Sequence, residues 1–465
     1  MTDAGKNGCE PMGRMLERAS GRVRMHMPGH KGKLPAEWMD SALDQTETAM
    51  TDDLFAPCSG IAQAQELYAR SAGAESTLFL TGGSTAGMLA MVLSSVREGG
   101  RLILPRNAHH SAMSACVWGD IEPVFVSPRV RVDGSTYMEA ADVLDAIARC
   151  PDAQAVLVTR PDYYGQLTEL EGIVRAAHEK GMRVLVDEAH GAHFPWQRDV
   201  KSAMESGADL CVQSAHKTLP ALTGAAVLHM TRGVDAAHVR RVLRMVHTSS
   251  PSFLIMRTMD GARAWMDAHG AQALDELRSR IDAFWRALAT GYGNAHAKWG
   301  GTVDPLRVVI DVTGRGYTGW EVSERLTRGG IDAEMADECR VVFIPSVWDE
   351  PDWLERAAAE LNALKPRAPL TVSRIWTQCL PPRAMRLRRA ALGESENVPL
   401  RDAAGRVCAV SAGVYPPGVP LCTPGERFTP GILSRIQNAP ERFRFGVEDG
   451  CVRCTADEGE EQHEI

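Results

Sequence analysis

The sequence predicts an α/β protein with three domains: a large domain around a mostly parallel, doubly wound, seven-stranded sheet, a smaller α/β domain, and a C-terminal α+β domain. Seven short apolar runs of strand type alternate with helical patterns between about residues 51 and 258. Strands that alternate with helices form βαβ crossovers, which place the strands parallel to one another. A shorter set of strand and helix signals follows, and a Pro-containing linker then separates the last part of the chain.

The predicted segments follow one another along the chain. Residues 1–50 are polar and interrupted by Pro and Gly, and they are expected to form an N-terminal arm. The large domain is expected at 51–258, the smaller α/β domain at 259–368 and the C-terminal domain at 369–465. The strand-like runs of the large domain are 76–80, 101–104, 123–126, 155–159, 183–186, 210–213 and 225–229.

The smaller domain is expected to begin with a long amphipathic helix, 261–291, that leads out of the large domain. Pro366 and Pro369 mark the linker to the C-terminal domain, which carries a Pro- and Gly-rich run at 415–420 and ends in an acidic tail. The other elements of the smaller domain are predicted at 306–312, 320–328, 341–344 and 353–364.

Composition excludes several classes of protein. The net charge of −8 argues against a general binder of nucleic acid or anionic membranes, because both need a basic face. No run of 18 apolar residues and no signal-type start occurs, so a cytoplasmic location is expected. The 11 cysteines are scattered and odd in number, which favours reduced thiols over a disulfide framework. Cys451 and Cys454 form a lone CxxC pair, and no metal site is predicted there.

Lys217 and Asp187 are the two residues that indicate the function most clearly. Asp187 ends an apolar strand, where the ligand groups of an open α/β sheet gather, and Lys217 follows about one βα unit later. A pyridoxal 5'-phosphate site needs a lysine that holds the aldehyde as a Schiff base and a carboxylate that keeps the pyridine nitrogen protonated. The two residues meet both requirements in the expected order.

A turn rich in Gly, Ser and Thr follows the first strand and opens an apolar helix. Its residues Gly83, Ser84 and Thr85 would allow close approach of the backbone and offer hydroxyl and N–H groups to a phosphate. Helix capping alone is the competing interpretation. His109 and His110 likewise follow a strand, and the ring of His109 is a candidate to lie flat on a cofactor; a capping or buried histidine is the alternative.

Two other sites are consistent with parts of the sequence. Asp187, His190, His193 and His216 are suitable ligands for a divalent metal, but that interpretation leaves Lys217 without a role. The glycine pattern at 314–319 matches a dinucleotide fingerprint, yet it comes late in the chain and lacks the expected acid about 20 residues on. It is interpreted as a turn in the smaller domain.

Several segments together resemble the Orn/Lys/Arg decarboxylase family in its short form. They include Met-Pro-Gly-His-Lys-Gly at 27–32 and Asp-Glu-Ala-His-Gly-Ala-His at 187–193. The resemblance implies a fold-type-I pyridoxal-phosphate enzyme of the aspartate-aminotransferase fold that decarboxylates arginine, lysine or ornithine. The other segments are 43–47, 51–54, 213–223 and 415–420.

The resemblance also implies roles for individual residues. Lys217 would bind the cofactor aldehyde, Asp187 would pair with the pyridine nitrogen, and His109 would stack on the ring. His190 would lie near the phenolic oxygen or the substrate carboxylate. Ser249 belongs to a segment that would reach the phosphate site of a neighbouring subunit, so a homodimer or a dimer of dimers with shared active sites is expected. The phosphate would be held by Gly83, Ser84, Thr85, Ser214 and His216.

The sequence leaves the substrate and parts of the mechanism open. Asp162 stands where the family usually has a small hydroxyl residue, and His110 replaces a common lysine. An added acid near the site would favour a cationic side chain or change the electrostatics beside the cofactor ring, and a mere change at the surface is the alternative. Lys217 and His216 are both candidates to return the proton to Cα. Another pyridoxal-phosphate reaction on the same fold and a catalytically silent regulatory partner are the alternative functions. The candidate acids for the distal cation of the substrate are Glu334, Asp337 and Glu426.

Overall fold

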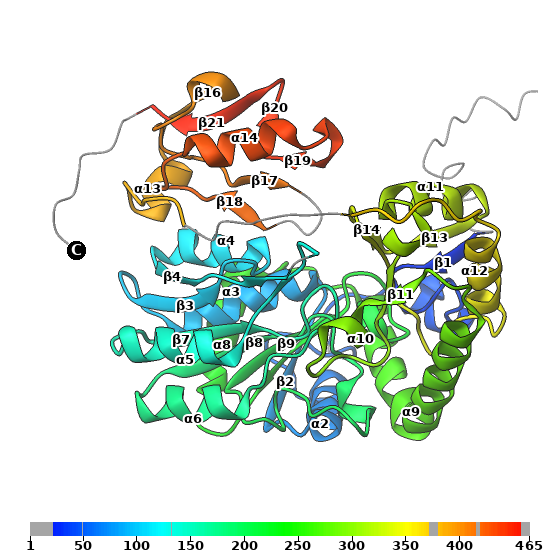
Figure 1. Ribbon diagram of the computed structural model, residues 1–465. Helices are drawn as coiled ribbons and strands as arrows, with labels where there is room; N and C mark the ends of the chain where they lie inside the picture. The colour runs from blue at the N-terminus through cyan, green and yellow to red at the C-terminus, as the bar shows by residue number, and fades with distance from the viewer. Residues whose placement is uncertain (1–21, 49, 132, 372–379, 415–418, 457–465) are drawn as a thin grey trace, which may run out of the picture.

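A seven-stranded sheet forms the centre of the large unit in this computed structural model, which describes residues 22–48, 50–131, 133–371, 380–414 and 419–456. The strand order is β2-β10-β9-β8-β7-β3-β4 (Figure 1). The neighbours from β9 to β4 are parallel, and β10 runs antiparallel to both β2 and β9. The prediction of a mostly parallel sheet is confirmed, with each strand within one residue of its predicted run. The strands are β2 Ser76–Leu80, β3 Arg101–Pro105, β4 Glu122–Val126, β7 Ala155–Thr159, β8 Arg183–Asp187, β9 Leu210–Gln213 and β10 Ala226–Met230.

Helices cover both faces of this sheet because successive side chains of each strand point to opposite sides. Leu102 and Leu104 of β3 pack with apolar residues of α3, α4 and α8 on one face. Ile103, between them, packs with residues of α5 and α6 on the other face. The strands are apolar almost throughout, as expected for a sheet buried on two sides. The helices of this unit are α2 Gly60–Ala72, α3 Gly83–Ser95, α4 His110–Gly119, α5 Ala140–Arg149, α6 Glu171–Glu179, α7 Ala215–Thr218 and α8 Ala236–Val246.

The long helix α9, Phe253–Ala287, leads from the large unit to a second, four-stranded sheet with the order β11-β12-β15-β14. It begins eight residues before the predicted start at 261, because the side chain of Ser252 caps it by accepting a hydrogen bond from the N–H of Ile255. The other elements of this smaller unit are β11 Gly293–Asn294, α10 Ala295–Trp299, β12 Val308–Asp311, α11 Gly319–Arg328, β13 Ile331–Ala333, β14 Met335–Ala336, β15 Arg340–Phe343 and α12 Trp353–Asn362.

The described part of the predicted N-terminal arm is tied to the smaller unit. Strand β1, Val23–Met25, pairs in parallel with β13. Lys31 is buried there, and its ammonium donates to three backbone carbonyls, those of Arg24, His26 and Ile344, at 2.9, 2.6 and 3.0 Å. The arm therefore forms part of the packed structure.

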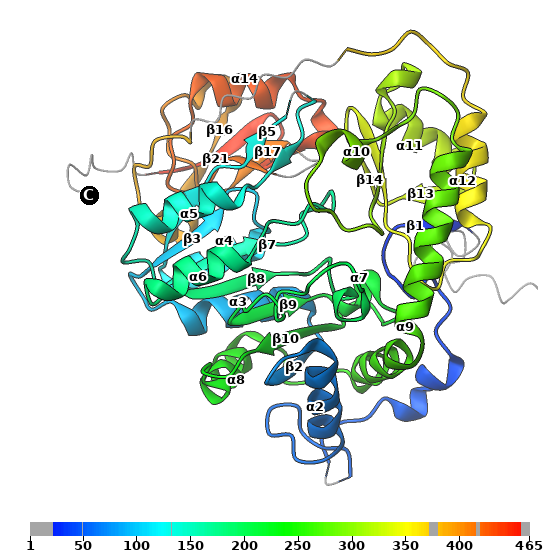
Figure 2. The ribbon, with the colours of Figure 1, turned by 60° about the horizontal axis from the view of Figure 1, so that its bottom comes forward.

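The C-terminal unit contains two three-stranded sheets, as an α+β domain should. Figures 1 and 2 both show it beside the β3 and β4 edge of the main sheet, with the smaller α/β unit at the right of each view. Residues 415–418 of the Pro- and Gly-rich run and the acidic tail lie outside the described residues. The domain boundaries themselves stay predictions. The elements are α13 Leu387–Leu392, β16 Ser395–Pro399, β17 Ala412–Val414, β18 Pro420–Cys422, α14 Pro430–Asn438, β19 Arg444–Phe445, β20 Val447–Glu448 and β21 Cys451–Thr455.

Short elements complete the described chain. The hairpin of β5 and β6 reaches the smaller unit through Asp133, which accepts a hydrogen bond from Trp299 at 2.8 Å. Among the described residues, no helix combines the length and the hydropathy that a membrane crossing requires. The short elements are β5 Arg129–Val130, β6 Thr136–Tyr137 and the 3-10 turns Ala36–Trp38, Ser41–Leu43, Phe194–Trp196, Thr313–Arg315, Leu400–Asp402 and Glu441–Phe443.

Candidate active site

A cavity of about 730 Å³ opens at the carboxyl ends of β3, β7, β8 and β9, where open α/β sheets bind their ligands. The loops after β3 and β7 contribute His109 and Asp162, the end of β8 contributes Asp187, α7 contributes Lys217, and the first turn of α3 contributes Ser84. The C-terminal unit supplies another wall, made of Val410, Ser411, Val419, Pro420, Phe445 and Gly446. The sheet thus brings together predicted site residues that are far apart in the sequence.

Lys217 and Asp187 share this cavity, as the sequence predicts. Burial lowers the pKa of Lys217, and the carboxylate of Asp187 opposes that shift. Burial raises the pKa of Asp187, and the charge of Lys217 opposes it in turn. The side chain of Asp187 accepts one backbone hydrogen bond, from Ala189 at 3.2 Å. The arrangement provides a buried amine and a buried carboxylate in a space large enough for a cofactor.

The start of α3 lies beside the cavity, and the N–H of Gly83 in this turn donates to the carbonyl of Gly224 at 2.8 Å. Gly82 caps the helix without a side-chain hydrogen bond, and Gly83 adopts a φ of +74°, which favours glycine. The hydroxyl of Ser214 donates to that of Ser84 at 2.8 Å. Ser84 lines the cavity, whereas Gly83 and Thr85 are its neighbours in the same turn. N–H groups at a helix start and two serine hydroxyls suit a phosphate dianion.

Unpaired polar atoms at the cavity wall also fit a polar ligand. Within the described ranges, the buried Oδ1 of Asn107 and Oγ1 of Thr159 have no hydrogen-bond partner. Buried polar atoms are normally paired, so a bound group that offers donors would satisfy them. Together with Lys217, Asp187 and the start of α3, these atoms fit pyridoxal phosphate.

His109 both caps a helix and lines the cavity. Its Nδ1 accepts a hydrogen bond from the N–H of Ser111 at 3.3 Å and so caps α4, and the ring also lines the cavity. Burial lowers the pKa of His109 to about 4, so the ring is neutral at physiological pH. His110 lies beside it, with 4.0 Å between the ring centroids. A neutral, fixed imidazole is suited to stacking on a cofactor ring.

His216 and Ser249 lie away from the cavity wall of this chain. The Nδ1–H of His216 donates to the carbonyl of Ala225 at 2.9 Å, and the ring is not among the lining side chains. Ser249 is exposed in the segment between α8 and α9. His216 is therefore a weaker candidate than Lys217 to return a proton to Cα.

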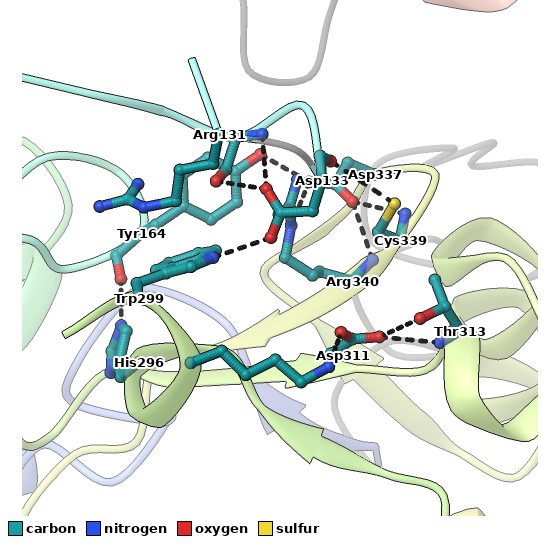
Figure 3. Close-up of polar contacts among 12 residues, drawn as sticks. Arg131, Asp133, Tyr164, His296, Trp299, Asp311, Thr313, Asp337, Cys339 and Arg340 are labelled. Atoms are coloured by element: carbon teal, nitrogen blue, oxygen red, sulfur yellow. Dashed lines mark hydrogen bonds and ion pairs between the residues drawn. The ribbon is translucent and has the colours of Figure 1, made fainter. Parts of the chain in front are cut away.

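Two of the three candidate acids for the distal cation are occupied elsewhere. Asp337 accepts hydrogen bonds from the hydroxyl of Tyr164 and the guanidinium of Arg340 at 2.6 and 2.9 Å (Figure 3). Glu426 forms two hydrogen bonds with Arg106, at 2.7 and 2.6 Å. Both acids join units of the structure and lie outside the cavity lining, so the geometry gives no support to the prediction that they bind substrate.

The third candidate acid, Glu334, is near the site but does not line the cavity. Its Oε1 accepts a hydrogen bond from the hydroxyl of Tyr163 at 2.7 Å, and its Oε2 accepts one from the N–H of Met27 at 3.0 Å. Glu334 also opposes the lowering of the Lys217 pKa. Its carboxylate therefore contributes to the field at the lysine and holds the arm.

Asp162 is instead the acid that the cavity wall presents. Its Oδ1 accepts hydrogen bonds from the N–H groups of Tyr164 and Gln166 at 2.9 and 2.8 Å, which fixes the loop after β7. Burial raises the pKa of Asp162 to about 6. Asp162 and Asp187 are the acids among the described side chains that line the cavity. The departure from the family pattern at this position is thus located inside the site.

Two contributions were missed by the reasoning from sequence. Arg307 of the smaller unit donates to Nδ1 of His190 at 3.2 Å, and no local pattern marks it. Gly29 lies against the lysine-bearing turn: its N–H donates to the carbonyl of His216 at 2.8 Å, and a Cβ there would lie 2.7 Å from the carbonyl oxygen of Leu219. The unusual density of Gly and Pro at 27–32 was the signal for this close approach.

The alternative sites find no support in the geometry. His193 faces Asp304, with 3.3 Å between Nε2 and Oδ1, while His190 and His216 have other partners. Across the described stretches of chain, no group of three or more His, Cys, Asp or Glu side chains is placed to hold a metal. In the glycine pattern at 314–319, a Cβ at Gly319 would collide with backbone carbonyls of the chain itself, so close packing of the turn accounts for that glycine.

Comparison with known proteins agrees with the site. Residues 39–295 match the major domain of Orn/Lys/Arg decarboxylases, and residues 373–439 match their C-terminal domain. The chain is 34% identical to an arginine decarboxylase of Halalkalibacterium halodurans over 91% of each chain. It is 32% identical to an arginine decarboxylase of Bacillus subtilis, over 89% of this chain and 90% of that one.

Solved structures show the same fold. Lysine decarboxylase A from Pseudomonas aeruginosa superposes with a TM-score of 0.75 at 19% identity, over 97% of this chain and 83% of that one. An aminotransferase of Bacillus subtilis, ureidoglycine-glyoxylate aminotransferase, has a TM-score of 0.57 at 14% identity, over 74% of this chain and 92% of that one. The site, the two matched domains and the relatives lead to one conclusion: the chain belongs to the Orn/Lys/Arg decarboxylase family.

Proposed function

We propose that this pyridoxal-phosphate-dependent decarboxylase acts on arginine and releases agmatine and carbon dioxide. The observation that carries the proposal is the buried pair of Lys217 and Asp187 in a cavity whose wall presents a further acid, Asp162. The two relatives described above, which match about nine tenths of this chain, are arginine decarboxylases, which favours arginine over lysine or ornithine. Another pyridoxal-phosphate reaction on the same fold is the second candidate.

The residues of the chain have separate tasks in this reaction. Lys217 would hold the cofactor through its aldehyde until the substrate amine takes the place of the lysine, and the released amine of Lys217 would return a proton to Cα. Asp187 would hold the proton on the pyridine nitrogen, and the neutral ring of His109 would present a flat surface to the cofactor. The bound cofactor supplies the electron sink for the pair left behind when carbon dioxide departs. The start of α3, with Ser84 and Ser214, anchors the phosphate.

The direct test is an assay of the purified protein with each amino acid separately. The visible spectrum should show bound cofactor, and agmatine should form from arginine faster than cadaverine forms from lysine or putrescine from ornithine. Cofactor absorbance without any of these amines would contradict the proposed substrate and favour the second candidate. Absence of cofactor binding would contradict the site.

Asp162 is the residue we propose to bind the distal cation. Its pKa of about 6 is raised by burial, so the carboxylate becomes charged as the pH rises through this value and then attracts a guanidinium. Asp162→Asn should raise KM for arginine by about 10-fold, the loss expected for one charge-assisted hydrogen bond of roughly 1.5 kcal/mol. The wild type should also lose affinity below about pH 6, and the variant should not.

Asp152→Asn provides a matched control because Asp152 is an exposed acid paired with Arg101 at the surface. Its KM and pH profile should equal those of the wild type. If Asp162→Asn changes kcat but leaves KM for arginine unaltered, Asp162 has another role.

We also propose that the active unit is a homodimer or a dimer of dimers. The segment with Ser249 follows α8 and is exposed in this chain, so a neighbouring subunit could contact it. Sedimentation at micromolar concentration should give at least twice the mass of the 50.6 kDa chain. An active enzyme that sediments as a monomer would contradict shared active sites. The expected cytoplasmic location also stays a prediction.

A further inference from the structure

His190 lies between a cation of the smaller unit and the cofactor-binding lysine. The guanidinium of Arg307 reaches Nδ1 of His190 at 3.2 Å, and Nζ of Lys217 reaches Nε2 at 3.1 Å. His190 and Arg307 are 7% and 3% exposed, so water does not compete freely for these contacts. Arg307 also donates to the carbonyl of Tyr163 at 3.2 Å, which holds the guanidinium in place. The three side chains form one chain of hydrogen bonds.

The direction of this chain follows from what each group can donate. An arginine has N–H donors and no acceptor, so Nδ1 of His190 must be the accepting, unprotonated nitrogen. Burial lowers the pKa of His190 far below its ordinary value, with further lowering by Lys217 and Arg307, and the ring is therefore neutral. A neutral imidazole that lacks a proton on Nδ1 carries it on Nε2.

The Nε2–H of His190 consequently points at Nζ of Lys217. An ammonium group has only donors, so a hydrogen bond between these two atoms requires an uncharged amine with a lone pair. Burial also favours the uncharged amine, because it lowers the pKa of Lys217. An amine needs that lone pair to form a bond with a carbonyl carbon.

We propose that Arg307 is a positioning residue that fixes the Nε2-protonated tautomer of His190, whose N–H then hydrogen-bonds the uncharged amine of Lys217. This inference rests on the proposed role of Lys217 in cofactor binding. It assigns functions to Arg307 and His190 that concern the lysine, independent of which amino acid is the substrate. The charged and titratable groups that face Lys217 or His190 include Asp187, Glu334, Arg307, Tyr163, His109 and His216.

The reactivity of the Lys217 amine tests the proposed role of Arg307 and His190. It is measured on the full-length chain after dialysis against an amine has removed the cofactor. Formaldehyde reacts with the uncharged lysine, its oxygen leaves as water, and cyanoborohydride supplies the hydride that completes N-methylation. The initial rate at Lys217, followed by mass spectrometry across a pH series, gives the midpoint for loss of the lysine proton. The exposed Lys201 serves as an internal reference in every sample.

Arg307→Met should lower the methylation rate of Lys217 at neutral pH by at least about 10-fold, because Nδ1 can then take the proton and Nε2 accepts from the ammonium form. His190→Phe should also lower the rate, since the donor to the uncharged amine is lost. In the His190→Phe background, Arg307→Met should have a much smaller effect. Arg307→Lys, which keeps a cationic donor, should restore part of the wild-type rate.

The double variant distinguishes an effect of Arg307 that passes through His190 from a direct electrostatic effect of the guanidinium on Lys217. An equal effect of Arg307→Met with and without His190 would show that the guanidinium acts on Lys217 through its field alone, and would overturn the proposal. Wild-type reactivity in either single variant would overturn it as well. If Arg307→Met does not fold, Arg307→Ala makes the same comparison with and without His190, and His190→Phe still tests the contact with Lys217. A wild type that fails to decarboxylate arginine but shows these shifts would contradict the proposed substrate and leave this inference standing.

Discussion

Lys217→Ala is expected to abolish decarboxylation and the visible absorbance of bound cofactor together. Lys217 is the lysine that lines the cavity in the described residues, so no other described lysine is placed to take over the bond to the aldehyde. General acid–base catalysis alone contributes roughly 10²–10⁴-fold, and loss of the covalent attachment adds to it. We therefore expect a fall in kcat of at least about 10³-fold, measured by release of carbon dioxide at saturating cofactor.

Lys201→Ala is a suitable control for this experiment. Lys201 is exposed and pairs with Glu171 at the surface, so its removal should leave both activity and absorbance unchanged. The fold of Lys217→Ala should also persist, since the side chain points into a cavity. Turnover by Lys217→Ala at more than a few per cent of the wild-type rate would show that another group binds the cofactor.

Arg106→Met should destabilise the contact between the large unit and the C-terminal unit. Arg106 follows β3 and forms two hydrogen bonds with Glu426, and both side chains are buried. Its guanidinium also donates to the carbonyl of Pro420 at 3.1 Å, close to the cavity wall. Removal of one partner leaves a buried charge unpaired, which costs about 3–5 kcal/mol.

Urea unfolding and steady-state kinetics would measure this effect. The unfolding midpoint should fall, and KM should rise because the wall that contains Val410 and Phe445 loses its anchor. The double variant Arg106→Met, Glu426→Leu should recover part of the stability, since an apolar pair of similar volume avoids the unpaired charge. Equal stability of the wild type and Arg106→Met would mean that this ion pair does not hold the units together.

Local patterns predicted the main sheet closely. The runs around Ile103 and Leu185 are apolar and bounded by turns, and a strand buried on both faces is the state that such runs stabilise. The beginning of α9 was predicted too late, because its cap depends on the side chain of Ser252 and the apolar pattern does not mark it. The order of the strands and the antiparallel β10 depend on contacts between distant segments, which periodicity does not encode.

The site, like the sheet, combines features that depend on local sequence with features that depend on contacts between distant segments. The family, the lysine and carboxylate pair, and the strand ends where a cofactor site forms were predictable from the sequence, because these depend on residue type and on spacing within a βα unit. The acids that line the cavity and the cation that contacts His190 could be identified only from the folded arrangement of the units. Arg106 and Glu426 are 320 positions apart, and His190 and Arg307 are 117 apart. Such partners are selected by the packing of separate units, and the free energy of a buried charge depends on that packing.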